Sequence, residues 1–113
     1  MIVGLICLEM MNSQPSYCDP VDLELIRLCL SGDEVAFDTM VTRFGRMIGE
    51  VVYRTAIRRN CELSDSKREE IVAKVLVELF SRDGEALRNF SGHSTFSTYL
   101  TVIARRVTIR EII

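Results

Sequence analysis

Small hydroxyl side chains gather in one short segment of the 113-residue chain, beginning at Ser91 and running into a predicted helix start at Ser94 or Thr95. Gly92 leaves the backbone open beside them. Five hydroxyl residues lie in this segment or on the first helical turn: Ser91, Ser94, Thr95, Ser97 and Thr98. Because a helix N-terminus presents unpaired N–H groups, the segment suits a phosphate group or the edge of an extruded base.

Aromatic and basic side chains follow on the same predicted helix. Phe96 and Tyr99 offer aromatic faces, and stacking on such a face contributes about 1–3 kcal/mol per nucleic-acid base. Arg105, Arg106 and Arg110 provide positive charge that neutralises a phosphate backbone. These residue types, taken with the hydroxyl segment, are typical of a site for a nucleic-acid strand.

Each of these residues also has a purely structural interpretation. Phe96, Leu100 and Ile103 recur at three- and four-residue spacing, so we expect them in the core. The hydroxyl groups would then only cap a helix, and the arginines would form a solvated face. For the loop and for Arg105 and Arg106 we favour the binding interpretation.

The common patterns of catalysis and metal binding do not occur in the sequence. The four cysteines contain no CxxC pair, and the single histidine, His93, lies more than thirty residues from the nearest of them. We therefore expect no metal and no cofactor. The GxGxxG, GxxxxGK and GxSxG loops are also missing, so we expect a protein that is not an enzyme. Its cysteine usage fits the reducing cytoplasm.

Charge limits how the chain as a whole can bind. Its 14 basic and 16 acidic residues give a formal net charge of −2, so no net field would hold it on duplex DNA or an anionic membrane. Any nucleic-acid contact must therefore be local. All but two of the basic residues are arginines, whose planar fork suits phosphate groups and base edges.

A second group of arginines lies on the long helix predicted after Asp33. Its members are Arg43, Arg46, Arg54, Arg58 and Arg59, opposed only by Glu50. They could follow a nucleic-acid backbone, but an ordinary solvated face fits at least as well. No site is assigned to them.

The elements that must position these residues are predicted to be helices. Asp19 caps a first helix that begins at Pro20 and ends at the left-handed stop of Gly32. Asp33 caps the second helix, which ends near Asn60.

A third helix is predicted to begin at a capping box formed by Ser66 and Glu69. Its apolar stripe ends over residues 81–84, after which Ala86 and Leu87 add a single turn. The fourth helix follows the hydroxyl segment. No segment alternates as a strand does, so the fold class is all-α, a compact bundle of about four helices.

The domain is predicted to cover residues 19–113, after a flexible N-terminal arm of residues 1–18. Residues 1–11 are apolar but too short to span a bilayer, and they lack the basic start of a signal peptide. Two interpretations stay open. Translation starts naturally at Met11, or the apolar residues form a disordered or hydrophobic arm.

Residues 90–100 read FSGHSTFSTYL and are followed by IAR at residues 103–105. From Asp22 onward, over about ninety residues, the chain resembles the second conserved region of bacterial sigma factors, closest to the extracytoplasmic-function group. That family has F-x-G-x-x-x-F-S-T-[WY]-L and then I-A-R at these positions. A weaker match is SGDEVAF at residues 31–37, similar to the family's Gly-Asp-x-x-Ala-Phe junction.

The resemblance implies a function for the hydroxyl segment. In the family, this loop and helix bind the non-template strand of the promoter minus-ten element. His93 falls at a variable position of the family pattern, where a solvated side chain is usual. The DNA-binding residues implied are Ser91, Gly92, His93, Ser94, Thr95, Ser97, Thr98, Tyr99, Arg105 and Arg106.

A second surface is implied on the third predicted helix, where the family docks on the clamp coiled coil of the RNA polymerase core. Residues 70–76 read EIVAKVL against the family's D-L-x-Q-E-x-F. Glu70 keeps the acid, Ala73 replaces the usual amide, and Lys74 reverses the usual carboxylate. These three residues and Val77 share one helix face, so a partner surface is geometrically allowed.

The resemblance thus implies a cytoplasmic sigma-factor domain that helps to initiate transcription, with polymerase core and single-stranded promoter DNA as partners and no membrane contact. Ala73 and Lys74 favour a rival, a sigma-fold interaction module that binds an anti-sigma factor or itself without docking on polymerase. A second rival, a duplex-binding helix-turn-helix regulator, lacks the expected short spacing. The family continues into a domain that reads the minus-thirty-five element, so this chain is either a fragment or a naturally truncated protein.

Overall fold

The computed structural model describes residues 18–113 of the chain. Within this range four helices and no strands are present, which confirms the all-α prediction. The helices are α1 (Pro20–Leu30), α2 (Glu34–Arg58), α3 (Asp65–Arg88) and α4 (Phe96–Ile112). The predicted arm and the proposed start at Met11 lie outside the described residues, apart from Cys18, which is only 4% exposed. None of the four helices is long and apolar enough to cross a membrane.

Side-chain caps fix where three of the helices begin, as predicted. The carboxylates of Asp19 and Asp33 accept hydrogen bonds from Val21 N (2.8 Å) and Ala36 N (3.0 Å). Thr95 caps α4. Each cap satisfies a backbone N–H group that the helix itself leaves without a partner.

The predicted capping box at the start of α3 is wrong. Ser64 is the cap, because its backbone is extended and its hydroxyl accepts a hydrogen bond from Lys67 N at 3.1 Å. Asp65 is then the first helical residue, where a carboxylate interacts favourably with the helix dipole. Ser66 consequently lies inside the helix.

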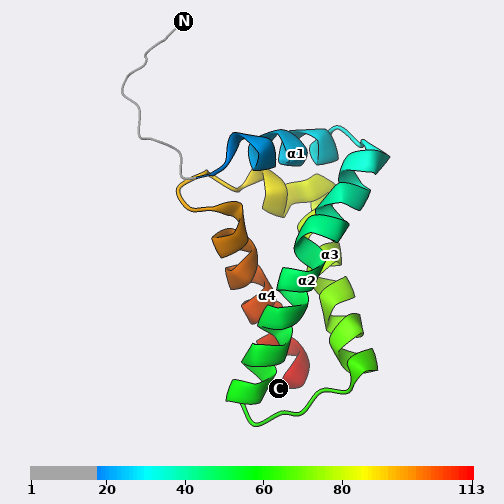
Figure 1. The fold of residues 1–113 in the computed structure, drawn as a ribbon, viewed down its shortest axis with the longest axis vertical. Helices are drawn as coiled ribbons and strands as arrows, with labels where there is room; N and C mark the ends of the chain where they lie inside the picture. The colour runs from blue at the N-terminus through cyan, green and yellow to red at the C-terminus, as the bar shows by residue number, and fades with distance from the viewer. Residues whose placement is uncertain (1–17) are drawn as a thin grey trace, which may run out of the picture.

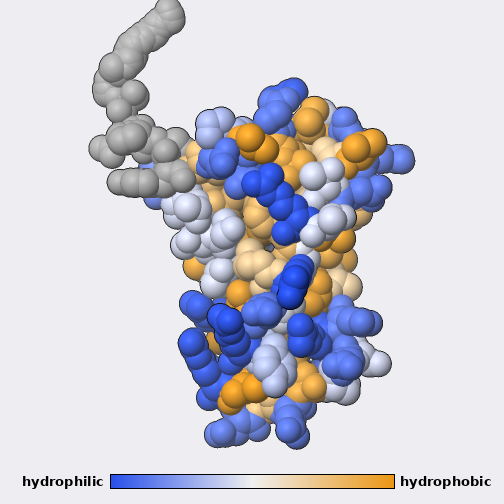
Figure 2. Space-filling view, viewed as in Figure 1, coloured by the Kyte–Doolittle hydropathy of each residue, from blue (hydrophilic) through white to orange (hydrophobic). Residues whose placement is uncertain are grey.

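The long helix α2 contacts each of the other three helices. α3 returns beside it in the opposite direction, α4 descends on its other side, and α1 lies across one end (Figure 1). On the face formed by α2 and α4, strongly hydrophilic residues gather over the lower half (Figure 2). The arrangement leaves one side of α4 facing α2 and the other side facing α3.

α3 changes direction over residues 81–84, where its predicted apolar stripe ends. Arg82, Asp83 and Gly84 have left-handed φ values of 54°, 57° and 74°. The Arg88 guanidinium holds this turn by donating to the carbonyl oxygens of Asp83 (2.8 Å) and Arg82 (3.3 Å). The turn allows the last part of α3 to lie beside α1, and the extra turn predicted around Leu87 is present with Leu87 buried.

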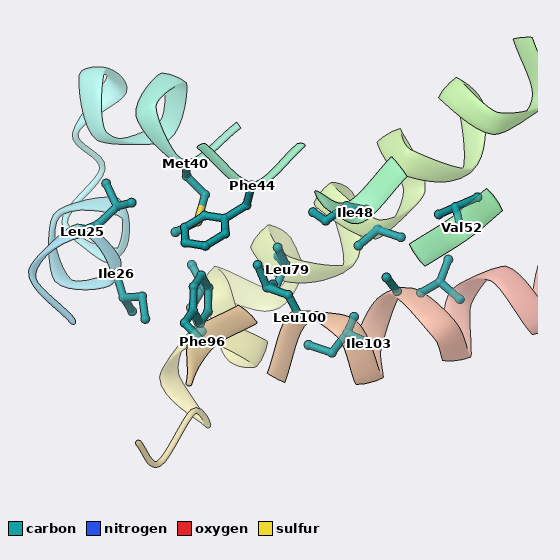
Figure 3. Packing of buried hydrophobic residues seen from close by; sticks show 14 of the residues in the cluster. Leu25, Ile26, Met40, Phe44, Ile48, Val52, Leu79, Phe96, Leu100 and Ile103 are labelled. Carbon is teal, nitrogen blue, oxygen red and sulfur yellow. The ribbon is translucent and has the colours of Figure 1, made fainter. Parts of the chain in front are cut away.

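The core is a continuous apolar cluster from all four helices (Figure 3). Phe44 of α2 and Phe96 of α4 meet edge to face at 5.2 Å between ring centroids. Phe96, Leu100 and Ile103 are buried, as their spacing predicts. Burying a large apolar side chain contributes roughly 1.5–3 kcal/mol, so this cluster fixes the position of α4 and of the loop before it.

Candidate nucleic-acid interface

The loop before α4 is an open turn anchored at both ends. Gly92 is buried and has a left-handed φ of 80°, which a residue with a Cβ atom adopts only with strain. Thr95 Oγ1 accepts a hydrogen bond from Thr98 N at 3.1 Å and donates to Thr98 Oγ1 at 2.9 Å. Ser91, just before Gly92, and His93, between the two anchors, are exposed, so their polar groups face solvent.

The hydroxyl groups of this site divide into structural and accessible ones. Thr95 is the helix cap, and the half-buried Ser94 donates its hydroxyl to the carbonyl oxygen of Thr95 at 3.0 Å. Ser97 and Thr98 are exposed on the first turn of α4. A ligand at the helix N-terminus can therefore reach Ser91, Ser97 and Thr98, and also the cap residue Thr95, which is exposed.

The aromatic side chains serve the core more than the surface. Phe96 has no exposed area, which confirms its predicted place in the core and excludes the alternative that it offers a stacking face. Tyr99 is half-buried against Phe90, with ring centroids 4.9 Å apart, and its hydroxyl donates to the carbonyl oxygen of Ala86 at 2.7 Å. Burial raises the pKa of the Tyr99 phenol, and the positive charge of Arg106 partly opposes this shift.

Arg105 and Arg106, predicted as a pair, face different helices. The Arg106 guanidinium lies 3.8 Å from a Glu78 carboxylate oxygen, and Arg110 lies 3.6 Å from the other oxygen of the same group. Arg106 therefore lines a cleft between α3 and α4, together with Tyr99. Arg105 instead faces α2.

Arg105 completes a groove between α2 and α4 of about 620 Å³. We call it the α2–α4 arginine groove; its charged lining residues are Arg43, Arg46, Glu50, Arg54, Arg58 and Arg105. Arg59 lies at its end, in a smaller adjoining hollow. The groove follows α2 from Arg43, which contacts α1, to Arg58 at the end of the helix.

Most of these arginines lack an acidic partner within the described part of the chain. Arg43 pairs with Asp22 of α1 at 2.9 Å, and Arg54 pairs with Glu50 at 3.2 Å. Among residues 18–113, no carboxylate lies within 4 Å of the guanidinium groups of Arg46, Arg58, Arg59 or Arg105. Positive charge is therefore concentrated here although the chain as a whole is slightly acidic.

The sequence itself contains a signal for this groove, in the second group of arginines, to which no site was assigned. Arg43, Arg46, Arg54 and Arg58 recur at spacings that keep them on one face of a helix. Their grouping with Arg105 depends on the packing of α2 against α4, which no local pattern predicts.

The predicted docking residues of α3 form an exposed face. Glu70, Ala73, Lys74 and Val77 are all exposed, and Val77 is 66% exposed. Lys74 Nζ lies 2.7 Å from a Glu111 oxygen and 3.4 Å from a Glu70 oxygen. The hydrogen bond to Glu111 raises the pKa of Lys74 and lowers that of Glu111. The reversed charge of this face thus has an intramolecular partner on α4.

Apolar surface continues from Val77 toward the start of α2. Phe80, one turn further along α3, contacts Phe37 with ring centroids 4.8 Å apart, and Phe37 is 42% exposed. Asp33, Glu34 and Asp38 line the hollow beside this ring pair. The result is an apolar surface with an acidic border.

No protein-family model, curated protein or solved structure matches the chain. The resemblance to sigma factors therefore depends on the motifs alone. Among residues 18–113, no cluster of three or more His, Cys, Asp and Glu side chains could hold a metal ion.

Proposed function

We propose that the chain is a sigma-factor domain that docks on the RNA polymerase core and binds the non-template strand of the promoter minus-ten element in the cytoplasm. The observation that carries the proposal is the form of the loop at residues 91–95. Its motif residues are divided between anchors, Gly92 and Thr95, and accessible polar groups, Ser91 and His93. An open loop of this kind at a helix N-terminus suits a base edge and its phosphate.

The loop would act by holding one extruded base. Extrusion costs a few kcal/mol of unstacking, which hydrogen bonds to the base edge offset. Ser91 and His93 supply hydrogen-bond donors and acceptors for that edge. Ser97 and Thr98 are exposed beside them and are available to contact the sugar-phosphate backbone of the same DNA strand. The domain carries out no chemistry in this account, since it only stabilises the melted strand for the polymerase.

Polymerase docking is assigned to the α3 face around Val77 and to the Phe37–Phe80 pair. An apolar centre with a charged border is the usual anatomy of a protein interface. The acidic border formed by Asp33, Glu34 and Asp38 favours a partner surface with basic side chains.

Capture of purified polymerase core by the full chain tests this assignment. Val77→Glu should abolish capture, because it introduces a charge into the apolar centre of the face. Val21→Glu is the matched control, since Val21 is similarly exposed, at 60%, but lies on α1. Equal capture by both variants, or no capture by the unaltered chain, would contradict the proposed docking.

A sigma-fold interaction module that does not dock on polymerase is a second candidate function. Lys74 favours it, because this residue carries the opposite charge to the family's docking residue and already forms an ion pair with Glu111. On this account the Val77 face would bind an anti-sigma factor or a second copy of the chain. Sedimentation of the unaltered chain and of Val77→Glu separates the two functions. A dimer that Val77→Glu dissociates, without capture of polymerase, would favour the interaction module.

A further inference from the structure

We propose that the α2–α4 arginine groove binds the sugar-phosphate backbone of a single DNA strand. The proposal rests on the proposed function only in taking this strand to be the one that the loop reads. It adds a second binding surface, on α2, to the residues that the family motif implies.

Positive charge exceeds negative charge in the groove. Only two of its five arginines have carboxylate partners, Arg43 with Asp22 and Arg54 with Glu50. On the rest of the described surface, Arg27 pairs with Glu24, Arg82 with Glu85, and Arg106 and Arg110 with Glu78. An ordinary solvated face would show such local pairing throughout. The groove instead keeps Arg46, Arg58 and Arg105 without carboxylates among the described residues. Guanidinium groups in this state are suited to bidentate contact with phosphate oxygens.

The length of the groove also fits a nucleic-acid strand. Arg43 and Arg58 are separated by fifteen residues of α2, which corresponds to about 22 Å at the rise of an α-helix. A stacked DNA strand has one phosphate about every 3.4 Å, so this distance corresponds to roughly six phosphates. The arginines thus extend along a line, as a chain of phosphates does, and do not converge on one point.

The groove is continuous with the loop before α4. Ser97, Thr101 and Arg105 follow one another at four-residue spacing, so they lie on the same face of α4. Thr101 and Arg105 line the groove, and Ser97 lies one turn nearer the loop, where its carbonyl oxygen accepts the Thr101 hydroxyl at 2.8 Å. A strand with one base in the loop therefore has a direct path into the groove. Tyr99 and Arg106 lie on the other side of α4 and are not on this path.

Fluorescence anisotropy of a labelled oligothymidine with the full chain tests the proposal, because a single base type removes any sequence preference of the loop. Arg46→Gln, Arg58→Gln and Arg105→Gln should each weaken binding about fivefold at low salt. Each should also reduce the log–log salt slope by about 0.7, the value for one lost contact to a single strand. Arg58→Lys should keep the slope, because the charge remains.

Two matched controls come from arginines outside the groove. Arg27→Gln on α1 and Arg82→Gln on α3 remove exposed arginines that already have acidic partners, so both should leave the salt slope unchanged. Thermal melts of every variant verify that folding is retained. A groove variant with the salt slope of Arg27→Gln would overturn the proposal, and so would an Arg82→Gln variant that loses as much affinity as Arg105→Gln.

A duplex of the same length provides the remaining comparison. Duplex binding that is as tight and as sensitive to Arg46→Gln would contradict the single-strand assignment. The test is independent of polymerase capture. If polymerase capture fails while oligothymidine binding needs the groove arginines, only the proposed sigma function is contradicted. If capture succeeds and these arginines have no effect on oligothymidine binding, only the groove proposal is contradicted.

Discussion

Lys74 Nζ of α3 lies 2.7 Å from a carboxylate oxygen of Glu111, on the last turn of α4. This ion pair joins two helices across the same face that was expected to dock on polymerase. Lys74 also approaches Glu70, which in turn pairs with Lys67 at 3.3 Å. The residue that departs most from the sigma pattern therefore has a structural role, and its substitution affects stability as well as docking.

Lys74→Glu should lower the melting temperature, because it removes the tie to Glu111 and brings a third carboxylate beside Glu70 and Glu111. The double variant Lys74→Glu/Glu111→Lys should recover stability, since it restores an opposite-charge pair. Because the double variant also restores the acid of the family's docking face, we expect it to capture polymerase core more strongly than the unaltered chain. Thermal melts and quantitative capture of both variants measure the two effects.

The prediction about the ion pair would be wrong if Lys74→Glu had the same melting temperature as the unaltered chain. The docking prediction would be wrong if the double variant folded normally and captured no more polymerase.

The same pair predicts a pH dependence of stability. The pKa of Glu111 is lowered from its ordinary 4.5. Its contribution to folding stability is therefore present above pH 4.5 and is lost as the pH falls through the lowered pKa. The pKa of Lys74 is raised from 10.5, so its contribution is present below that value and is lost as pH rises through the raised pKa. Urea unfolding of the unaltered chain and of Lys74→Met should therefore differ most near neutral pH.

The difference between the two proteins should shrink in acid and in strong alkali, and added salt should reduce it because the pair is partly exposed. A stability difference that stayed constant from acid to neutral pH would rule out the ion pair as its cause.

Gly84→Ala should destabilise the fold by about 1–2 kcal/mol, the cost of a left-handed conformation for a residue with a side chain. Its Cβ atom would also lie 2.6 Å from the Leu30 side chain, which would have to move. Each kcal/mol corresponds to roughly 4–8 °C in melting temperature for a domain of this size.

Gly45→Ala is the matched control, because Gly45 lies inside α2 with no atom within 4 Å of the added Cβ. It should stabilise the protein by about 0.5–1 kcal/mol. Melting shifts of the same sign for the two alanine variants would mean that the left-handed turn in α3 is absent in solution.

Tyr99→Phe distinguishes the structural role of this side chain from a stacking role. It removes the 2.7 Å hydrogen bond to the Ala86 carbonyl and should reduce stability by about 0.5–1.5 kcal/mol. The ring remains against Phe90, so oligothymidine affinity should change little. A loss of affinity without a change in melting temperature would instead assign the hydroxyl to the nucleic acid.

Local signals in the sequence were sufficient for most of the fold. Asp19, Asp33 and Thr95 are caps whose side chains bond within a few residues, so their role follows from short-range spacing. The cap of α3 was misassigned to Ser66, because two serines, two residues apart, satisfy similar patterns and only the extended backbone of Ser64 decides between them.

The site was less predictable because it depends on packing between helices. Arg105 and Arg106 are adjacent in sequence, yet one faces α2 and the other pairs with Glu78 of α3. Helical geometry separates neighbouring side chains by about 100°, but only the position of α4 between α2 and α3 decides which partner each side chain meets. The Lys74–Glu111 pair, joining residues far apart in sequence, was missed for the same reason.

The proposed function requires that the loop at residues 91–95 reads a base of the minus-ten element. A selection over randomised minus-ten promoters, with polymerase core present, tests it directly by comparing the unaltered chain with a loop variant. The variant changes Ser91, His93 and Ser94 but keeps Gly92 and Thr95, so that the left-handed turn and the α4 cap remain. We predict a shift in the preferred base at one or two adjacent positions of the non-template strand. Selection of the same sequence by both proteins, or of no sequence by the unaltered chain, would contradict the claim.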